Sequence, residues 1–331
     1  MKKSEFLLIP KSNHFRDFIS LMDISDEIRK NGHNCINLLA PVSDKNLSYL
    51  LKQKKFDFVF RVNKGKPEGI DKNIRFISWL TDISNTKELE NFNENDVIYT
   101  LKNSKTKSKK IIIKRLIPAA NIFSKVKTVY DYELLLGNSN FQEVDFSAVS
   151  NFYRYELFNG NKKKIFNSHK KDMNENNLFY QLIKSLKKKY KVNVFGTMDY
   201  SKVFLDNFIN YKGEVNNFNY FLEIFRNSKF NFIFDEDYLN FNTNFFNILL
   251  VGGTLILNKK LQNWNKKYLE SDKEFTNCYI SYCDTETFQS KISEFYDDFQ
   301  KRLMLGKKAS VLVKNNHTYK NRVKQILKDL I

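Results

Sequence analysis

Short apolar runs alternate with helix-like patterns along the N-terminal half of the chain. The run EFLLIP, at 5–10, is suited to a buried strand. Residues 16–32 carry apolar positions at helical spacing and close on a glycine, a common helix stop. The same alternation continues, with strands expected at 33–41, 56–62, 74–80, 96–101 and 110–118 and a second helix at 43–55. The order strand, helix, strand, helix, strand is typical of a parallel sheet.

The alternation starts again in the second half, after a polar, charge-rich stretch at 157–177. Helices are expected at 177–190, 220–228 and 242–253, and strands at 191–196, 229–234 and 254–258. Three further helical patterns, at 284–299, 300–315 and 317–331, finish the chain. The pattern predicts two doubly wound, Rossmann-like α/β domains in series, followed by C-terminal helices.

The length of 331 residues fits two domains, since single cores stop growing at roughly 250–300 residues. We place the first domain at 1–155, the second at 156–310 and a C-terminal helix at 311–331. Open α/β sheets bind ligands outside the carboxyl ends of their strands. Two such domains facing a cleft direct the search for function to the loops at those ends.

The net charge of the chain is large, but the types of basic residue that produce it do not favour a nucleic-acid partner. The formal net charge is +18, which invites a nucleic-acid partner, but only nine of the 55 basic residues are Arg, the side chain best suited to planar phosphate and base contacts. We therefore expect no nucleic-acid partner. Lysine clusters at 103–114 and 184–191 instead favour peripheral contact with an anionic membrane.

The sequence carries no apolar stretch long enough to cross a bilayer, and its start turns polar after five apolar residues, too soon for a secretory signal. Cys35, Cys278 and Cys283 match neither a zinc ligand set nor a redox pair. We expect a cytoplasmic protein that touches the inner face of the membrane.

Two acidic residues follow the apolar strand at 229–234. Asp235 and Asp237 have a DxD spacing that can hold a divalent cation against a nucleotide diphosphate, or simply form an acidic loop. The sequence contains neither GxGxxG nor a Walker motif, so dinucleotide and P-loop sites have no support.

Polar residues gather where the helix at 242–253 begins. Asn242, Thr243 and Asn244 can cap this helix, and the free N–H groups and dipole of a helix start favour an anion such as a diphosphate. Asn247 lies one turn further on the same face. Plain N-capping of a buried helix is the alternative explanation.

Two candidates for acid–base chemistry lie in the first half. His14 follows the first strand, where a near-neutral imidazole can act as a general base, although an ordinary loop histidine has the same pattern. Asp82 ends the fourth strand near Trp79 and can orient the base or accept a sugar hydroxyl bond; a strand-terminating aspartate is the alternative.

The order of segments resembles the GT-B glycosyltransferases, in particular the bacterial group 1 branch that includes spore-maturation-like proteins. The stretches that carry the likeness are 27–39, 76–82, 208–234, 242–257 and 283–299 running on to NNHTYKNRVKQIL at 315–327. The last pair is the most specific, because the branch has a HTY..R step into its final helix. There His317, Thr318 and Tyr319 would start the helix and Arg322 would be their structural partner one turn on.

This resemblance implies a hexosyltransferase-like enzyme of polysaccharide biosynthesis, with the nucleotide-sugar donor in the second domain and a surface polysaccharide, lipid-linked or protein acceptor in the first. It implies no bound metal and no cofactor, because a helix terminus and basic side chains stabilise the departing diphosphate. His14 and Asp82 would be the base and its neighbour. The donor site would be shaped by Gly196, Asn242, Thr243, Asn244, Asn247 and Gly252.

The sequence departs from the family at the donor helix. Asn247 stands where a glutamate is usual, Asn244 at an arginine-like position, and Leu239 where a second acid is expected. An amide still bonds hydroxyls but lacks the charge-assisted strength of a carboxylate. A degenerate, non-catalytic binding or assembly protein is therefore the alternative, with a basic nucleic-acid-binding protein a further one.

Overall fold

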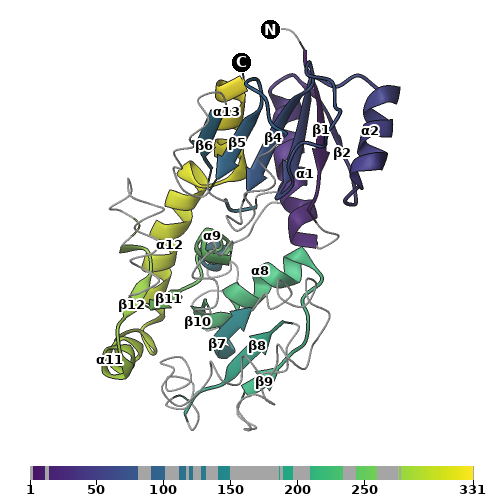
Figure 1. The fold of residues 1–331 in the computed structure, drawn as a ribbon. Helices are drawn as coiled ribbons and strands as arrows, with labels where there is room; N and C mark the ends of the chain where they lie inside the picture. The colour runs from purple at the N-terminus through teal and green to yellow at the C-terminus, as the bar shows by residue number, and fades with distance from the viewer. Residues whose placement is uncertain are drawn as a thin grey trace. The chain divides into compact units, whose positions relative to one another are not determined.

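The structure is a computed structural model of the whole chain. It describes residues 3–11, 15–80, 91–100, 112–116, 119–121, 128–131, 141–149, 186, 189–196, 209–233, 244–258, 275 and 277–330. The chain forms two compact units (Figure 1). Unit 1 comprises Met1–Lys125, Leu239–Phe241 and Asn315–Ile331, and unit 2 comprises Val126–Tyr238 and Asn242–Lys314.

Unit 1 is built on a six-stranded, fully parallel sheet of order β2-β1-β3-β4-β5-β6. Its strands are β1 (Glu5–Ile9), β2 (Asn34–Asn37), β3 (Phe58–Val62), β4 (Arg75–Leu80), β5 (Val97–Thr100) and β6 (Ile112–Arg115). All six lie within the runs predicted from sequence. The four inner strands are mostly apolar because both faces of a parallel sheet are covered, whereas the edge strands β2 and β6 are half polar.

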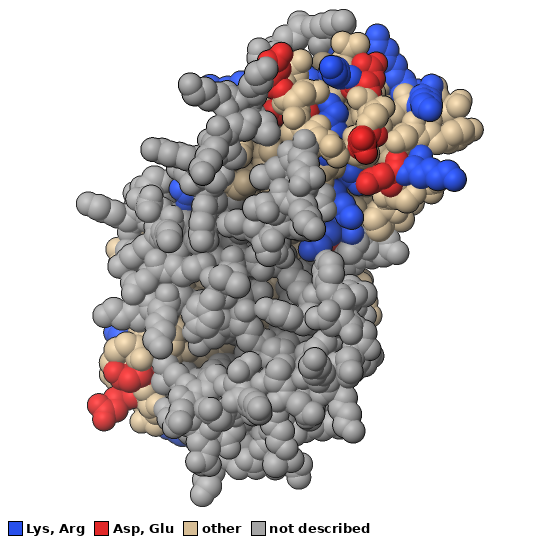
Figure 2. All heavy atoms as spheres, in the orientation of Figure 1, with Lys and Arg blue, Asp and Glu red and all other residues tan. Residues whose placement is uncertain are grey.

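Helices cover the two faces of this sheet. The helices α1 (Phe15–Lys30) and α13 (Tyr319–Leu330) pack on one face, where Leu21, Ile24 and Val323 meet the side chains of β1 and β3. The helix α2 (Asp44–Gln53), which Ser43 caps, packs on the other face. On the side that Figure 2 shows, Lys and Arg side chains are interspersed with Asp and Glu over the part of unit 1 that carries α2.

The HTY..R step has the structural role predicted for it. The Arg322 guanidinium lies 3.2 Å from His317 Nδ1, and the carbonyl of His317 accepts a bond from Ala120 N. Tyr319 is buried and packs edge-on against Trp79. Burial raises the pKa of Tyr319 to about 12 and lowers the pKa of Arg322 to about 10. These side chains fix the start of α13 to the core of unit 1.

Unit 2 has a second fully parallel sheet, of order β12-β11-β10-β7-β8-β9. Its strands are β7 (Val144–Val149), β8 (Val192–Phe195), β9 (Ile209–Tyr211), β10 (Ser228–Phe232), β11 (Leu255–Asn258) and β12 (Ile280–Tyr282). Its helices are α8 (Phe218–Arg226), α9 (Asn244–Leu250), α11 (Thr285–Phe295) and α12 (Phe299–Asn316), of which α12 runs on into unit 1. Two Rossmann-like units with C-terminal helices give the α/β GT-B architecture expected from sequence.

The boundary between the two units differs from the one predicted from the sequence, which lay between residues 155 and 156. Unit 2 begins at Val126 rather than at 156, because β7 pairs with β8 and β10. The last helix returns to unit 1. No helix in the described ranges combines the length and apolar character that a membrane crossing requires.

The three cysteines differ in exposure. Cys35 and Cys278 are buried, and desolvation raises the pKa of Cys35 to about 11, whereas Cys283 is exposed. At pH 8 only about one Cys35 thiol in a thousand is ionised, and the thiolate is the reactive form. We expect Ellman's reagent to label one thiol quickly in the native protein and none in Cys283→Ser. Any fast thiol in native Cys283→Ser would contradict this burial.

Candidate functional site

The sheet of unit 2 has a topological switch point between β7 and β10. These strands are neighbours, although β8 and β9 intervene in the chain and pair on the far side of β7. Numbered within the unit, this is the 3-2-1-4-5-6 order of dinucleotide-binding folds, in which ligands bind at the carboxyl ends of the strands where the order reverses. The donor site is therefore sought around the end of β7.

Asn244, the first residue of α9, lies at this switch point. Its Nδ2 donates to the carbonyl of Val149, the last residue of β7, at 3.0 Å, and the side chain is 2% exposed. The helix that follows β10 is thus tied to the end of the neighbouring strand. This amide N–H holds the helix start in place.

Asn247 is more deeply enclosed. It is 1% exposed, and every residue of α9 is buried. Asn247 follows Asn244 by one turn, as the sequence indicated, so both amides lie on one face of a short buried helix. A ligand at the switch point would have to reach Asn247 past the start of α9.

Gly196 lies on the other side of β7, directly after β8. Its φ is 145°, which glycine adopts without strain, and it turns the chain away from the sheet. Its N–H donates to Gly213 O at 2.9 Å, and its carbonyl accepts from the Tyr211 hydroxyl at 2.7 Å. Gly196 and Asn244 therefore lie on either side of the end of β7. Both residues were predicted from the sequence to shape the donor site.

Gly252 lies at the opposite end of α9, toward the start of β11. With φ of 73° it closes the helix: its N–H donates to Leu249 O, and Gly253 N donates to Ile248 O. It also lies against α12, because a Cβ added to Gly306 would come within 2.1 Å of the Gly252 carbonyl oxygen. Helix closure and packing account for Gly252.

Unit 1 has its own switch point, between β1 and β3. The loop that leaves β3 there begins with Asn63, whose φ of 51° makes it the one non-glycine residue with positive φ among the described residues. Such conformations cluster at functional sites. The next residue, Lys64, is exposed at the carboxyl edge of the sheet. The sequence reading passed over this loop; its signal is Asn-Lys-Gly after an apolar strand.

Several side chains hold this loop rigidly. Arg61 donates to the Gly65 carbonyl at 2.6 Å and to Asp44 Oδ1 at 2.8 Å, and the Ser78 hydroxyl contacts the Lys64 carbonyl. Because its backbone is bonded on several sides, the loop presents the Lys64 side chain from a fixed position.

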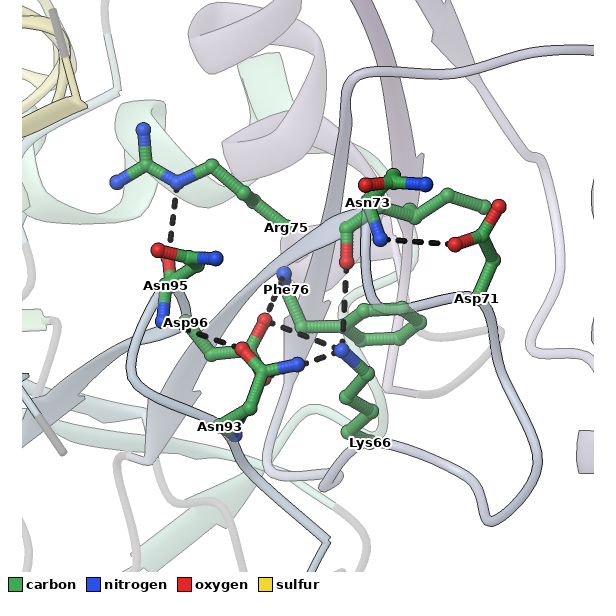
Figure 3. A network of polar contacts seen from close by, with 9 residues as sticks. Lys66, Asp71, Asn73, Arg75, Phe76, Asn93, Asn95 and Asp96 are labelled. Carbon is green, nitrogen blue, oxygen red and sulfur yellow. Dashed lines mark hydrogen bonds and ion pairs between the residues drawn. The ribbon is translucent and has the colours of Figure 1, made fainter. Parts of the chain in front are cut away.

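Farther along, the loop is anchored by a buried ion pair (Figure 3). The Lys66 ammonium lies 3.2 Å from Asp96 Oδ2 and also donates to Ile74 O at 3.3 Å. The Asp96 carboxylate accepts the backbone N–H groups of Phe76 and Asn93 as well, at 2.7 and 2.8 Å. Both side chains are 3% exposed or less. The pair is structural, since every partner belongs to the sheet or its connections.

Four predicted site residues lie outside the described residues: His14, Asp82, Asn242 and Thr243. Asp235 and Asp237, the alternative cation ligands, also lie outside them. Within the described ranges, no three His, Cys, Asp or Glu side chains gather as a metal site. The roles of these residues stay predictions.

Comparisons with known proteins address the family. Residues 171–328 match the family model described as glycosyl transferase-like. No curated protein sequence matches the chain. A glycosyltransferase from Rickettsia africae ESF-5 has a similar structure, with a TM-score of 0.62 at 10% identity over 100% of this chain and 98% of that one.

Two further solved structures are similar over almost the full length of both chains. Anabaena Alr3699/HepE in complex with UDP-glucose has a TM-score of 0.58 at 10% identity, covering 99% of this chain and 100% of that one. An α-glucosyltransferase in complex with UDP and a 13-mer DNA has a TM-score of 0.59 at 11% identity, covering 99% of each. At these identities the likeness shows the fold. The chain therefore has the fold of these glycosyltransferases, and its residues 171–328 match the glycosyl transferase-like family model.

Proposed function

We propose that the protein transfers a sugar from a nucleotide-sugar donor, bound at the β7–β10 switch point of unit 2, to a hydroxyl group of an acceptor bound by unit 1. The observation that carries this is the strand order of the unit 2 sheet, in which every strand except β7 lies within the segment that matches the glycosyl transferase-like model. UDP is the favoured nucleotide, since similar structures hold UDP or UDP-glucose. No metal or cofactor takes part in this proposal.

The chemistry would be displacement at the anomeric carbon. A base removes the proton of the acceptor hydroxyl while the diphosphate leaves toward the donor helix and nearby backbone N–H groups. His14 and Asp82 are our proposed base and its neighbour. For the donor we propose Gly196, Asn242, Thr243, Asn244, Asn247 and Gly252, with Gly252 acting through the shape of α9.

Nucleotide binding is tested by thermal unfolding of the protein with UDP, GDP, CDP or dTDP, with and without a divalent cation. A ligand that binds only the folded state at 100 times its Kd adds about 2.7 kcal/mol. We expect UDP to raise Tm by several degrees and Asn247→Ala to abolish most of that shift. Asn227→Ala is the matched control. Asn227 ends α8 just before the start of β10, at the amino ends of the strands and away from the switch point, so this variant should keep the full shift.

Flat melting curves with all four nucleotides would overturn the donor proposal and favour the non-catalytic alternative. An unchanged UDP shift in Asn247→Ala would leave the donor but remove Asn247 from its site. Loss of activity in chelator would restore the cation hypothesis for Asp235 and Asp237.

For the acceptor we propose a surface polysaccharide, a lipid-linked glycan or a protein. The test measures UDP release from UDP-glucose with each class in turn. Duplex DNA is included because one similar structure contains DNA. Transfer to DNA alone would overturn this acceptor proposal.

A further inference from the structure

The helix α12 carries two apolar side chains that point to solvent. Met304 is 72% exposed and Val311 is 47% exposed, while the opposite side of the helix is buried. We call Met304, Lys307, Lys308, Val311 and Lys314 the outer face of α12. The lysines of this face are all exposed as well.

Helical geometry orders these side chains in a regular way. Met304 and Val311 are two turns apart and lie on one line along the helix. Lys307 and Lys314 lie on one side of that line, and Lys308 lies on the other. An apolar line with lysines on both sides is the pattern of a helix that lies in a lipid interface. In such a helix the lysine stems lie along apolar surface and their ammonium groups reach the headgroups.

A half-buried tyrosine strengthens one side of this face. Lys307 Nζ and Lys314 Nζ lie 6.0 and 5.8 Å from the ring centre of Tyr130, and Lys314 Nζ is 3.4 Å from its hydroxyl. Burial raises the pKa of the Tyr130 hydroxyl, but hydrogen bonds with Thr128, Ser310 and Lys314 and the charge of Lys314 outweigh burial, so the pKa is lowered. Tyrosine, with an apolar ring and a polar tip, suits the boundary between lipid and water.

The charged side chains of α12 itself are all basic. No acidic residue occurs in the sequence between Asp298 and Asp329. By contrast, basic groups near α2 are paired with acids, as in Arg61–Asp44 and Lys54–Glu5. An anionic surface therefore meets no repulsion from the outer face of α12 itself.

We propose that the outer face of α12 binds the surface of an anionic lipid bilayer. Positive charge alone would serve nucleic acid equally well, but the exposed Met304 and Val311 have no counterpart on a phosphate backbone, whereas they fit the acyl boundary of a membrane. This surface differs from the lysine clusters at 103–114 and 184–191 that the sequence suggested. The inference does not rest on transfer activity.

Flotation of the full chain with lipid vesicles tests this. We expect binding to phosphatidylcholine vesicles containing phosphatidylglycerol and little binding to phosphatidylcholine alone. Lys307→Gln/Lys308→Gln should weaken binding about 25-fold, since each lysine contributes about fivefold. Met304→Gln/Val311→Gln should weaken it about tenfold or more. Lys45→Gln/Lys52→Gln, on the exposed face of α2, removes the same charge elsewhere and should bind as the parent does.

Circular dichroism and melting temperature confirm that each variant is folded. If the α12 and α2 lysine variants lost vesicle binding equally, net charge alone would explain the binding, and the proposal would be overturned. Undiminished binding by Met304→Gln/Val311→Gln, together with equal binding to duplex DNA, would overturn it in favour of a general polyanion surface.

Discussion

Asp96→Asn is expected to lower the free energy of unfolding of unit 1 by about 3–5 kcal/mol, the usual cost of breaking a buried ion pair by removing one partner. The substitution keeps the shape of the side chain and removes its charge. The Lys66 ammonium would then be buried with one carbonyl, Ile74 O, and the ring of Phe76, whose centre is 5.1 Å away. The amide would also turn an N–H group toward backbone donors that now meet carboxylate oxygens.

Urea unfolding followed by tryptophan fluorescence measures this loss. The chain has two tryptophans, so a Trp264→Phe background leaves Trp79, in the core of unit 1, as the reporter. Asp71→Asn is the matched control, because Asp71 belongs to the β3–β4 loop that carries Lys66 but is exposed and accepts one backbone N–H bond. We expect this control to cost about 1 kcal/mol or less.

A double variant separates the pair from the packing around it. Lys66→Met/Asp96→Asn removes both charges, and should lose less stability than the sum of the two single variants. An Asp96→Asn midpoint equal to that of Asp71→Asn would show that Lys66 and Asp96 contribute no more than an exposed side chain does.

The second large effect is expected at Gly306. Alanine normally favours a helix interior by about 1 kcal/mol over glycine. Here its methyl carbon would lie 2.1 Å from the carbonyl oxygen of Gly252, a backbone atom that cannot swing aside. Overpacking of this kind costs typically 1–3 kcal/mol. Since α9 and α12 must separate, we expect Gly306→Ala to destabilise unit 2 by about 2 kcal/mol or more.

Hydrogen exchange measured by mass spectrometry locates this effect. Peptides covering α9 should lose protection, because the Ser310 hydroxyl, on α12, also bonds the Leu250 carbonyl at the end of α9. Lys307→Ala is the control on the same helix, with its side chain in solvent, and should leave that protection unchanged. Unchanged protection in Gly306→Ala would refute the close approach of these helices.

Sequence reasoning found the strands of unit 1 because each is a run of apolar residues. It missed β7, β9 and β12 in unit 2. In β7 the side chains of Asp145 and Ser147 interrupt the apolar pattern, and the strand is recognisable only from its pairing with β8 and β10. Pairing between distant segments leaves no local mark on the sequence, so the boundary between the units was placed too late in the chain.

In the candidate site, too, local patterns could be predicted from the sequence and contacts between distant segments could not. The polar start of α9 could be predicted from the sequence. The carbonyl that Asn244 binds could not, because it belongs to Val149, 95 residues earlier. A local pattern identifies a group that can form a hydrogen bond and does not identify its partner. The positive φ of Asn63 could not be predicted from the sequence either, because it accompanies a hydrogen bond from Asn63 N to the carbonyl of Trp79 on the neighbouring strand.

The return of the chain to unit 1 has a consequence for synthesis on the ribosome. The sheet of unit 1 is translated before unit 2, but its core also includes side chains that are translated after unit 2: Tyr319, Val323, Ile326, Leu327 and Leu330. At roughly 5–20 residues per second, the nascent sheet waits on the order of 10–40 s for the helix that covers it. Unit 2, whose residues lie together in the chain, can complete its core earlier, so the sheet of unit 1 is the one that stays uncovered longer during translation.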